Sequence, residues 1–292
     1  MQQKVRSRLE FILKNSKLPS SILISGPSGS GKILIATELC SSLLCFEKSY
    51  PPCGKCPSCR LLRGIIPPKL GVEKHLNELS HPDFYCALAE KSEIKIDQIR
   101  TILSSISLKP ALSSAKVALI YPADNMNVFA QNALLKTLEE PPKDSYIILV
   151  SNNPESLLKT VRSRLFEVRC PPLSDEELSA LTGISDSGLI NKSRASALLL
   201  KKLKEKPALL ELVKNLNDPV KFYKSSQELE KLDIDEQSTV LTLLSQSFNE
   251  KAIKTKNIEL TKKAQAITEL LANLGKGLKI GPQLALILHP EG

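Results

Sequence analysis

The sequence predicts an α/β protein in which a parallel sheet carries helices on both faces and is followed by an all-helical C-terminal part. Two observations predict this fold class. Apolar runs without polar alternation, as in buried parallel strands, occur at residues 22–24, 117–120 and 147–150. Helical patterns separate these runs, whereas beyond residue 174 such patterns continue with no further strand candidate.

The helices expected around the sheet follow from the spacing of apolar residues. The first covers residues 4–14, and the second, at residues 32–44, comes directly after the first strand and a Gly-rich turn. Two more are expected at residues 94–108 and 129–138, between the later strands. An alternation of strands and helices along the chain is what a sheet covered on both faces requires.

Proline residues mark the expected domain boundaries. Pro171 and Pro172 precede Ser174, which together with three following acidic residues is typical of a helix start. Helical patterns then cover residues 189–204, and Pro207 precedes the last amphipathic helices. We therefore expect three parts: an α/β domain at 1–171, a small helical unit at 172–206 and a C-terminal helical domain at 207–292.

The composition is that of a soluble globular protein of about two domains. The chain has 292 residues, 42% of them apolar and 24% charged, and no apolar run long enough to cross a membrane. Its first residues are charged where a secretory signal peptide needs an apolar core, so we expect a cytoplasmic protein. Because aromatic residues make up only 4% and Trp is absent, a surface that grips single strands by base stacking is not expected.

The charge of the chain is unevenly distributed. There are 40 basic and 31 acidic residues, a net charge of +9. Residues 207–292 hold 11 of each sign, so the whole excess lies in residues 1–206. A basic part is suited to the phosphates of a nucleic acid or a nucleotide, and direct contact with DNA stays open. The neutral C-terminal part indicates a different partner.

A phosphate-binding loop is expected between the first strand and its helix. Residues 26–33 read G-P-S-G-S-G-K-I, which contains the P-loop pattern G-x4-G-K in the strand–loop–helix context it needs. Gly26, Gly29 and Gly31 permit the backbone conformations by which N–H groups surround a phosphate. The amino group of Lys32 would reach the terminal phosphates. These four residues are the expected nucleotide-binding residues.

The groups that would hold Mg²⁺ and activate water are missing. Ile33 stands where a P-loop needs a hydroxyl for Mg²⁺. Tyr121 and Pro122 stand where a metal-binding carboxylate and an acid for the attacking water are needed, and Asp124 is interpreted as a loop or capping acid. Each lost electrostatic element costs about 10²–10³ in rate. We therefore expect no meaningful ATPase activity from this chain, only weak ATP binding and no Mg²⁺.

Four closely spaced cysteines predict a structural zinc module at residues 45–59. Cys53, Cys56 and Cys59 form two overlapping C-x2-C pairs, and Cys45 at the end of the preceding helix supplies a fourth thiolate. In a reducing compartment this spacing favours Zn²⁺ over disulfides, and a redox pair would leave two cysteines unexplained. Four protein ligands leave no open position for catalysis. The remaining cysteines are expected in the apolar core: Cys40, Cys86 and Cys170.

Several segments resemble one protein family. Residues 132–142, N-A-L-L-K-T-L-E-E-P-P, are similar almost letter for letter to a signature of the clamp-loader AAA+ subunits of bacterial DNA polymerase III, delta-prime and gamma/tau. Supporting segments are the cysteine module, His81-Pro82-Asp83, residues 96–100 and residues 157–164. The resemblance is strongest over residues 5–172. It implies an AAA+ domain, a small lid at 172–206 and a C-terminal collar domain that holds the chain in a ring of subunits.

The resemblance also implies a role for Arg164. The family's Ser-Arg-Cys motif, here Ser163-Arg164-Leu165, supplies an arginine finger in trans to the ATP site of a neighbouring subunit. A guanidinium is permanently charged and planar, so it can neutralise charge on a γ-phosphate across an interface. Leu165 and Lys159 replace the usual Cys and Pro of the family. A surface salt bridge is the alternative role of Arg164.

The lost catalytic positions are similar to those of delta-prime, the subunit that does not hydrolyse ATP. The resemblance then implies gamma/tau and delta subunits as partners, with the sliding clamp and primed DNA reached through the assembled complex. A short gamma-type subunit that hydrolyses ATP itself, for instance through Asp124, and an AAA+ protein outside replication stay open as alternatives. Residues 151–153 take the sensor 1 position and Arg194 is a candidate for sensor 2. Residues 61–80 form an extra loop without an assigned role.

Overall fold

The structure, a computed structural model, divides the chain into two units. It describes residues 2–15, 18–66, 72–89, 93–193, 196–274 and 279–289. Unit 1 comprises Met1–Ser185 and Ala195–Leu198, and unit 2 comprises Asp186–Arg194 and Leu199–Gly292. The expected boundaries at residues 171 and 206 stay predictions. Within the described residues no helix is both long and apolar enough to cross a membrane.

Unit 1 is built on a five-stranded sheet with the order β2-β3-β4-β1-β5, and every pairing in it is parallel. The strands are β1 (Ser21–Ser25), β2 (Phe84–Leu88), β3 (Lys116–Tyr121), β4 (Ser145–Ser151) and β5 (Phe166–Arg169). The three central strands are those that the apolar runs predict. The two edge strands, with the sequences FYCAL and FEVR, are less buried and mix polar with apolar residues, which is why no apolar run marks them.

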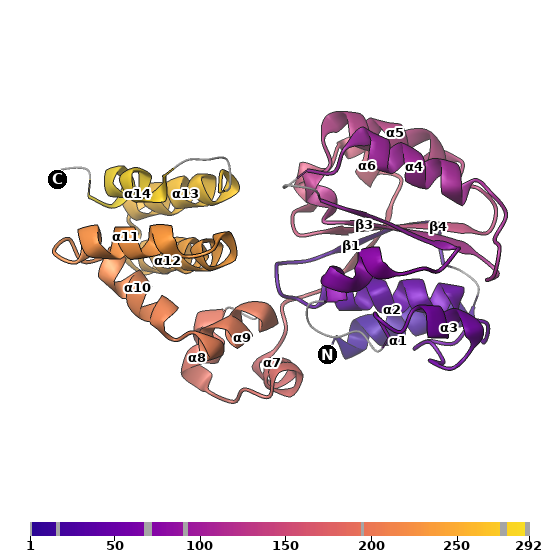
Figure 1. Cartoon of the computed structure of the whole chain (residues 1–292), viewed down its shortest axis with the longest axis horizontal. Coiled ribbons are helices and arrows are strands. Elements are labelled where there is room, and N and C mark those ends of the chain that lie inside the picture. Colours follow the sequence, from indigo (N-terminus) through magenta and orange to yellow (C-terminus); the bar gives the residue numbers. More distant parts are fainter. Residues whose placement is uncertain are drawn as a thin grey trace. The chain divides into compact units, whose positions relative to one another are not determined.

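Helices cover both faces of this sheet (Figure 1), which confirms the expected fold class. One face carries α1 (Gln3–Lys14), α2 (Lys32–Leu44), α3 (Pro57–Leu61) and the 3₁₀ helix η1 (Val72–Glu78). The other carries α4 (Ile96–Ile106), α5 (Val128–Glu139) and α6 (Lys159–Arg162). Side chains alternate between the faces, so that in β1 Ile22 and Ile24 pack with the α2 layer and Leu23 packs with the α5 layer.

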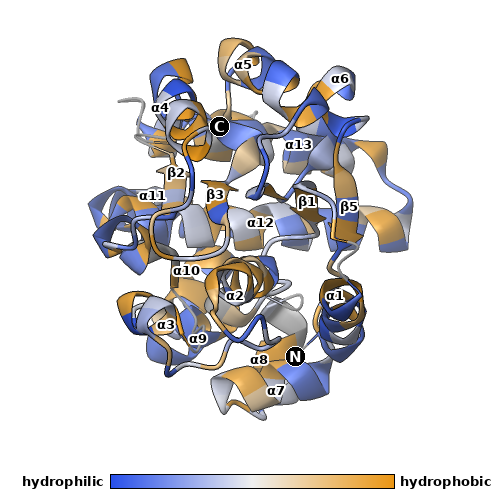
Figure 2. Cartoon of the chain, turned by 90° about the vertical axis from the view of Figure 1, so that its right-hand side faces the viewer, coloured by the Kyte–Doolittle hydropathy of each residue, from blue (hydrophilic) through white to orange (hydrophobic). Residues whose placement is uncertain are grey.

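Helix α2 is enclosed on all sides, and only Ile33 among its residues is not buried. In Figure 2 this helix and the strands beside it are largely in the orange of hydrophobic residues. The phosphate-loop candidate at its start and the cysteine module at its end are therefore attached to one of the most deeply packed elements of the chain. Two short 3₁₀ helices complete the strand ends, η2 (Ala123–Asn125) after β3 and η3 (Pro154–Ser156) after β4.

Helices follow the last strand, beginning with α7 (Asp175–Thr182). The side chain of Ser174 accepts a hydrogen bond from the Glu177 N–H at 3.2 Å, and the Glu177 carboxylate accepts one from the Ser174 N–H at 3.3 Å, which confirms the expected helix start. The helical stretch expected at residues 189–204 is two helices, because α8 (Ser187–Ser193) ends before α9 (Ala197–Glu205) begins.

Unit 2 buries the apolar faces of its helices against one another. Its remaining helices are α10 (Ala208–Leu216), α11 (Phe222–Lys231), α12 (Ile234–Thr255), α13 (Ile258–Ala272) and α14 (Ile280–Leu288). Helix α12 packs against α10, α11 and α13, and it contributes Val240, Leu244 and Phe248 to the core. Helix α14 begins at Ile280, so Pro282 lies in its first turn.

Candidate functional site

The phosphate-loop candidate connects β1 to α2, as the motif requires. Gly29 has a φ of +79°, a left-handed conformation that favours glycine, and Gly31 caps the start of α2 with the same φ. A Cβ atom at Gly26 would collide with the backbone carbonyl oxygen of Cys170 at the end of β5. The glycines of the motif are thus required by the backbone path and by the close approach of a neighbouring strand.

Lys32 turns its amino group back onto this loop. The side chain is buried, and its Nζ donates a hydrogen bond to the Pro27 carbonyl oxygen at 2.9 Å. Burial lowers the pKa of Lys32 to about 8, against the opposing effect of Asp124 and Cys170. The expected nucleotide-binding residues lie together, with the lysine bound to its own loop.

Two segments from elsewhere in unit 1 contact the loop. Gln2 donates from its Nε2 to the carbonyl oxygens of Ser30 and Pro171, at 3.0 and 2.5 Å. A Cβ atom at Gly29 would collide with the backbone and side chain of Ser196, which lies just before α9. Arg194, the sensor 2 candidate, lies outside the described residues.

Asp124 holds the ends of β3 and β4 together. Its carboxylate accepts hydrogen bonds from the Ser151 hydroxyl at 2.5 Å and from the backbone N–H groups of Asn152 and Asn153 at 2.7 and 3.1 Å. The Ser156 hydroxyl, at 3.3 Å, is a fourth donor. Asp124 is therefore a loop acid bonded to residues 151–153, the candidate sensor 1 segment, in agreement with its interpretation as a loop or capping acid.

Arg164 lies at the surface between α6 and β5. Its Nε donates to Glu139 Oε1 at 2.8 Å, and a second guanidinium nitrogen forms an ion pair with the same oxygen at 2.5 Å. A third nitrogen donates to the carbonyl oxygen of Thr160 at 2.8 Å. The side chains of Arg164 and Glu139 are 34% and 50% exposed. Glu139, which is itself exposed to solvent, thus holds the arginine in a defined position.

The four cysteine sulfurs converge as the spacing predicts. The Sγ atoms of Cys45, Cys53, Cys56 and Cys59 all lie within 4.8 Å of one another, and those of Cys53 and Cys59 are 3.9 Å apart. Four sulfurs bound tetrahedrally to Zn²⁺ at about 2.3 Å are about 3.8 Å from one another. Each of the seven cysteines is free of a disulfide. The cluster therefore fits a metal ion with four thiolate ligands.

Backbone groups favour the thiolate form of Cys53 in this cluster. The N–H groups of Lys55 and Cys56 lower the pKa of Cys53 to about 6, whereas burial raises the pKa of Cys59. Outside the cluster, Cys40 and Cys170 are fully buried as expected. Cys86 differs from the expectation because β2 is an edge strand, and this residue is only partly buried, with its Sγ donating to Asn77 Oδ1 at 3.3 Å.

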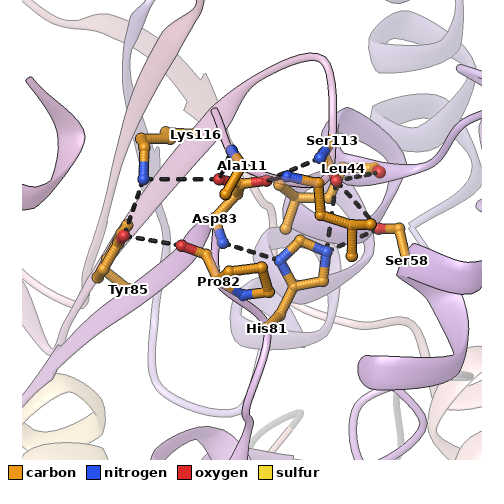
Figure 3. A network of polar contacts seen from close by, with 10 residues as sticks. Leu44, Ser58, His81, Pro82, Asp83, Tyr85, Ala111, Ser113 and Lys116 are labelled. Carbon is orange, nitrogen blue, oxygen red and sulfur yellow. Dashed lines mark hydrogen bonds and ion pairs between the residues drawn. The ribbon is translucent and has the colours of Figure 1, made fainter. Parts of the chain in front are cut away.

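Asp83 is a buried carboxylate with several hydrogen-bond partners (Figure 3). It belongs to the segment His81-Pro82-Asp83, which stands out in the sequence only because it resembles the clamp-loader family. Three consecutive backbone N–H groups, those of residues 111–113, donate to it at 2.7–2.8 Å. Its Oδ1 is 3.5 Å from Lys116 Nζ. Burial alone would raise the pKa of Asp83, but these donors and the lysine outweigh it and hold the pKa below its usual value. The partners are 28 residues or more away in the sequence, so no local pattern announces them.

Comparison with known proteins places these features in a family context. Residues 1–174 match the family model described as DNA polymerase III, delta subunit. The chain is 36% identical over 152 residues to DNA polymerase III subunit delta' of Pseudomonas aeruginosa, a match that covers 51% of this chain and 42% of that protein. It is 30% identical over 178 residues to the subunit delta' of Bacillus subtilis, covering 61% and 50%. The chain thus spans about half the length of the curated relatives it matches.

A solved structure shares the fold. The crystal structure of a DNA polymerase III gamma subunit-related protein from Thermotoga maritima matches with a TM-score of 0.52 and 20% sequence identity. The match covers 96% of this chain and 97% of that one. The fold expected from the resemblance, an AAA+ parallel sheet flanked by helices with a helical C-terminal region, is confirmed.

Proposed function

Because the chain belongs to the DNA polymerase III delta-subunit family, we propose that it acts as a delta-prime-type subunit of the clamp loader. In this role it does not hydrolyse ATP, and it supplies Arg164 as an arginine finger in trans to the ATP site of a neighbouring subunit during loading of the sliding clamp onto primed DNA. One combination of features carries the proposal. The phosphate loop lacks the groups that bind Mg²⁺ and activate water, and the same chain has an exposed arginine, Arg164, at its surface.

The chemistry around the loop supports the absence of hydrolysis. Ile33 offers no oxygen for Mg²⁺, and the end of β3 presents a phenol and a pyrrolidine ring from Tyr121 and Pro122. The Asp124 carboxylate already accepts hydrogen bonds from the Ser151 hydroxyl and from the N–H groups of Asn152 and Asn153. A metal ligand and a water-activating acid are both needed for phosphoryl transfer to water. Binding of ATP at Gly26, Gly29, Gly31 and Lys32 would accordingly be weak.

The environment of Arg164 suits a role in trans. A guanidinium presents several donors in one plane, which suits the oxygens of a phosphate. An exposed ion pair such as that with Glu139 contributes only about 0–1 kcal/mol, so exchanging the carboxylate for a γ-phosphate costs little. The bond to the Thr160 carbonyl oxygen keeps the side chain oriented during that exchange.

The remaining parts are assigned roles in assembly. The helices of residues 207–292 form the collar that contacts gamma/tau and delta subunits, and residues 172–206 form the lid. The neutral charge of the collar favours a protein contact over a DNA contact. Partners outside the ring, the clamp and primed DNA, are reached through the assembled complex.

The cysteine cluster holds a structural zinc ion. Cys45 follows the last residue of α2 and Cys56 caps the start of α3, so a bound ion would join the ends of two helices. Four thiolates fill a tetrahedral site completely, and the ion supplies cross-linking and charge neutralisation rather than catalysis.

Reconstitution tests the function. The chain is combined with gamma/tau and delta subunits, clamp and primed DNA, and ATP turnover is compared for wild type and Arg164→Ala. We expect DNA-stimulated turnover to fall while assembly, followed by gel filtration, is unchanged. Arg162→Ala is the matched control, because that arginine is two residues away and pairs with Glu155. Equal turnover in wild type and Arg164→Ala would remove the role of the arginine.

Turnover by the isolated chain decides the competing assignment. A gamma-type subunit would hydrolyse Mg·ATP by itself, and Lys32→Ala would abolish that activity. We expect no difference between wild type and Lys32→Ala above background. Turnover well above the variant would favour the gamma-type alternative.

A further inference from the structure

A buried histidine connects the cysteine module to the sheet (Figure 3). Ser58 lies on α3 between Cys56 and Cys59, and its Oγ is 2.9 Å from His81 Nε2. Both residues are buried, Ser58 fully and His81 with 3% of its surface exposed. The hydrogen bond is therefore buried, and losing one partner of a buried hydrogen bond is costly.

The hydrogen bonds fix the protonation state of this histidine. The backbone N–H of Asp83 donates to His81 Nδ1 at 3.1 Å, so Nδ1 carries no proton and Nε2 carries the single ring proton. His81 Nε2 is accordingly the donor to the Ser58 hydroxyl. Burial lowers the pKa of His81, against the opposing effect of Asp83, in keeping with a neutral ring.

The same ring nitrogen also lies close to Ser113, which bonds to the backbone beside Cys45. The Oγ of Ser113 is 3.3 Å from His81 Nε2 and 3.3 Å from the Ser58 Oγ. It donates to the carbonyl oxygen of Leu44 at 2.9 Å, the residue before Cys45. One imidazole nitrogen thus lies within 3.3 Å of two hydroxyls. One belongs to the residue between Cys56 and Cys59, and the other bonds to the backbone beside Cys45.

The position of Ser113 is itself fixed by a hydrogen bond to Asp83. The Ser113 N–H donates to Asp83 at 2.7 Å, and Asp83 pairs with Lys116 at the start of β3. Lys116 donates to the Tyr85 hydroxyl at 2.9 Å, and that hydroxyl donates to the Pro82 carbonyl oxygen at 2.7 Å. The turn that carries His81 is consequently attached to two strands of the sheet.

We propose that His81 is the positioning residue of the four-cysteine metal site: through Ser58 and Ser113 it sets Cys45 at the correct distance from the C-x2-C-x2-C segment. This inference rests on the proposed metal site. His81 touches no ligand sulfur in the hydrogen-bond network, and it acts through the two serines. Outer partners that orient metal ligands typically contribute about 10–100-fold to metal affinity.

Zinc release from the full chain tests the inference. Zinc-loaded wild type, Ser58→Ala, Ser113→Ala, His81→Gln and His81→Asn are mixed with excess chromogenic chelator, and the rate of zinc transfer is recorded. We expect each serine variant to bind one ion and to release it about tenfold faster or more. His81→Gln keeps a donor near the position of Nε2, so it should release zinc more slowly than His81→Asn.

A matched control separates this role from a general loss of packing. His75 is an exposed histidine of η1 that contacts only Glu78 among the hydrogen bonds of the described residues, and His75→Gln should release zinc at the wild-type rate. Substitution of Co²⁺ gives a second measurement, because thiolate-to-cobalt absorption bands report the geometry of the four sulfurs. We expect these bands to shift in Ser58→Ala and His81→Asn and not in His75→Gln.

The outcomes distinguish the possible failures. Wild-type release rates and spectra in both serine variants and in His81→Asn would overturn the inference, as would equal rates for His81→Gln and His81→Asn with an unaltered cobalt spectrum. If the histidine variants do not fold, the serine variants alone decide the matter, since each loses a single hydroxyl. A wild-type chain that binds no zinc or cobalt would overturn both the metal site and the inference, and it would leave the reconstitution test of Arg164 unaffected.

Discussion

Charged side chains of unit 1 differ in their roles according to the groups that surround them. Lys32 and Asp124 are both close to the phosphate loop, yet one bonds to its own loop and the other joins two strand ends. Asp83 and Lys116 form a buried ion pair in which backbone donors satisfy the carboxylate. Removing one partner of such a group leaves the others unsatisfied, which makes these residues sensitive reporters.

Lys32→Met should stabilise the chain at neutral pH. The pKa of Lys32 is 10.5 ordinarily and about 8 in the folded state, so between pH 8 and 10.5 the unfolded chain binds more protons and stability rises with pH. Below pH 8 the folded state bears the full cost of the buried charge, on the order of 3 kcal/mol. The lost hydrogen bond to Pro27 offsets about 1 kcal/mol of the gain. Urea unfolding at pH 7 and pH 9.5 measures the effect.

The pH dependence is the decisive part of this prediction. Between pH 8 and pH 10 the wild type should become more stable relative to Lys32→Met, so the advantage of the variant shrinks. Lys136→Met, at an exposed position of α5, should show no such change. A constant difference between wild type and Lys32→Met from pH 7 to pH 10 would show that the lysine is not desolvated in the folded state.

Asp124→Ala should destabilise unit 1 by about 1–3 kcal/mol. The carboxylate accepts hydrogen bonds from the Ser151 hydroxyl and from two backbone N–H groups, and hydrogen bonds to charged groups are among the stronger ones. Chemical unfolding of the purified chain measures the loss. Asp97→Ala serves for comparison, because Asp97 is 84% exposed and its contact to Arg100 is 3.7 Å long. Equal losses in the two variants would contradict a structural role of Asp124.

At the scale of elements, whether a strand can be located from the sequence depends on how deeply it is buried. Strands covered on both faces, such as β1 and β4, are continuous apolar runs and can be located within one or two residues. The edge strands β2 and β5 cannot be located in this way, because their contact with solvent permits polar residues in them. Helix ends are predictable where a capping residue is present, as at Ser174.

Asp233→Ala should weaken the start of α12. The Asp233 side chain accepts a hydrogen bond from the Glu236 N–H at 2.8 Å, and the Glu236 carboxylate bonds to the Asp233 N–H at 3.4 Å. Loss of such a cap costs about 1 kcal/mol. Hydrogen exchange of the first-turn amides of α12 should accelerate about fivefold, whereas Glu228→Ala, at an exposed position of α11, should leave them unchanged. Unchanged exchange in Asp233→Ala would mean that the cap contributes nothing.

Across the whole molecule, the parts of the candidate site that sequence can predict are those built from neighbouring residues. The phosphate loop and the four cysteines have diagnostic spacing, so their convergence is predictable. The partners of His81 cannot be predicted in this way, because Ser58 and Ser113 are 23 and 32 residues away and meet the histidine only through the packing of the sheet. The ion pair of Arg164 with Glu139, 25 residues apart, depends on tertiary structure in the same way.

Metal removal should loosen one region of the chain and leave the rest folded. In small zinc domains the metal supplies most of the folding free energy. Unit 1, however, has large apolar clusters on both faces of its sheet, and these clusters include none of the four cysteines of the module. Chelation of the zinc-loaded chain should therefore raise hydrogen exchange about tenfold or more in residues 45–62, where the cysteines join α2 to α3. Amides of β3 and of α12 should keep their protection, since their hydrogen bonds belong to the sheet and to unit 2. Loss of protection in β3 together with the cysteine module would mean that the metal supports the whole of unit 1, and unchanged exchange at the module would mean that the thiolates hold no ion.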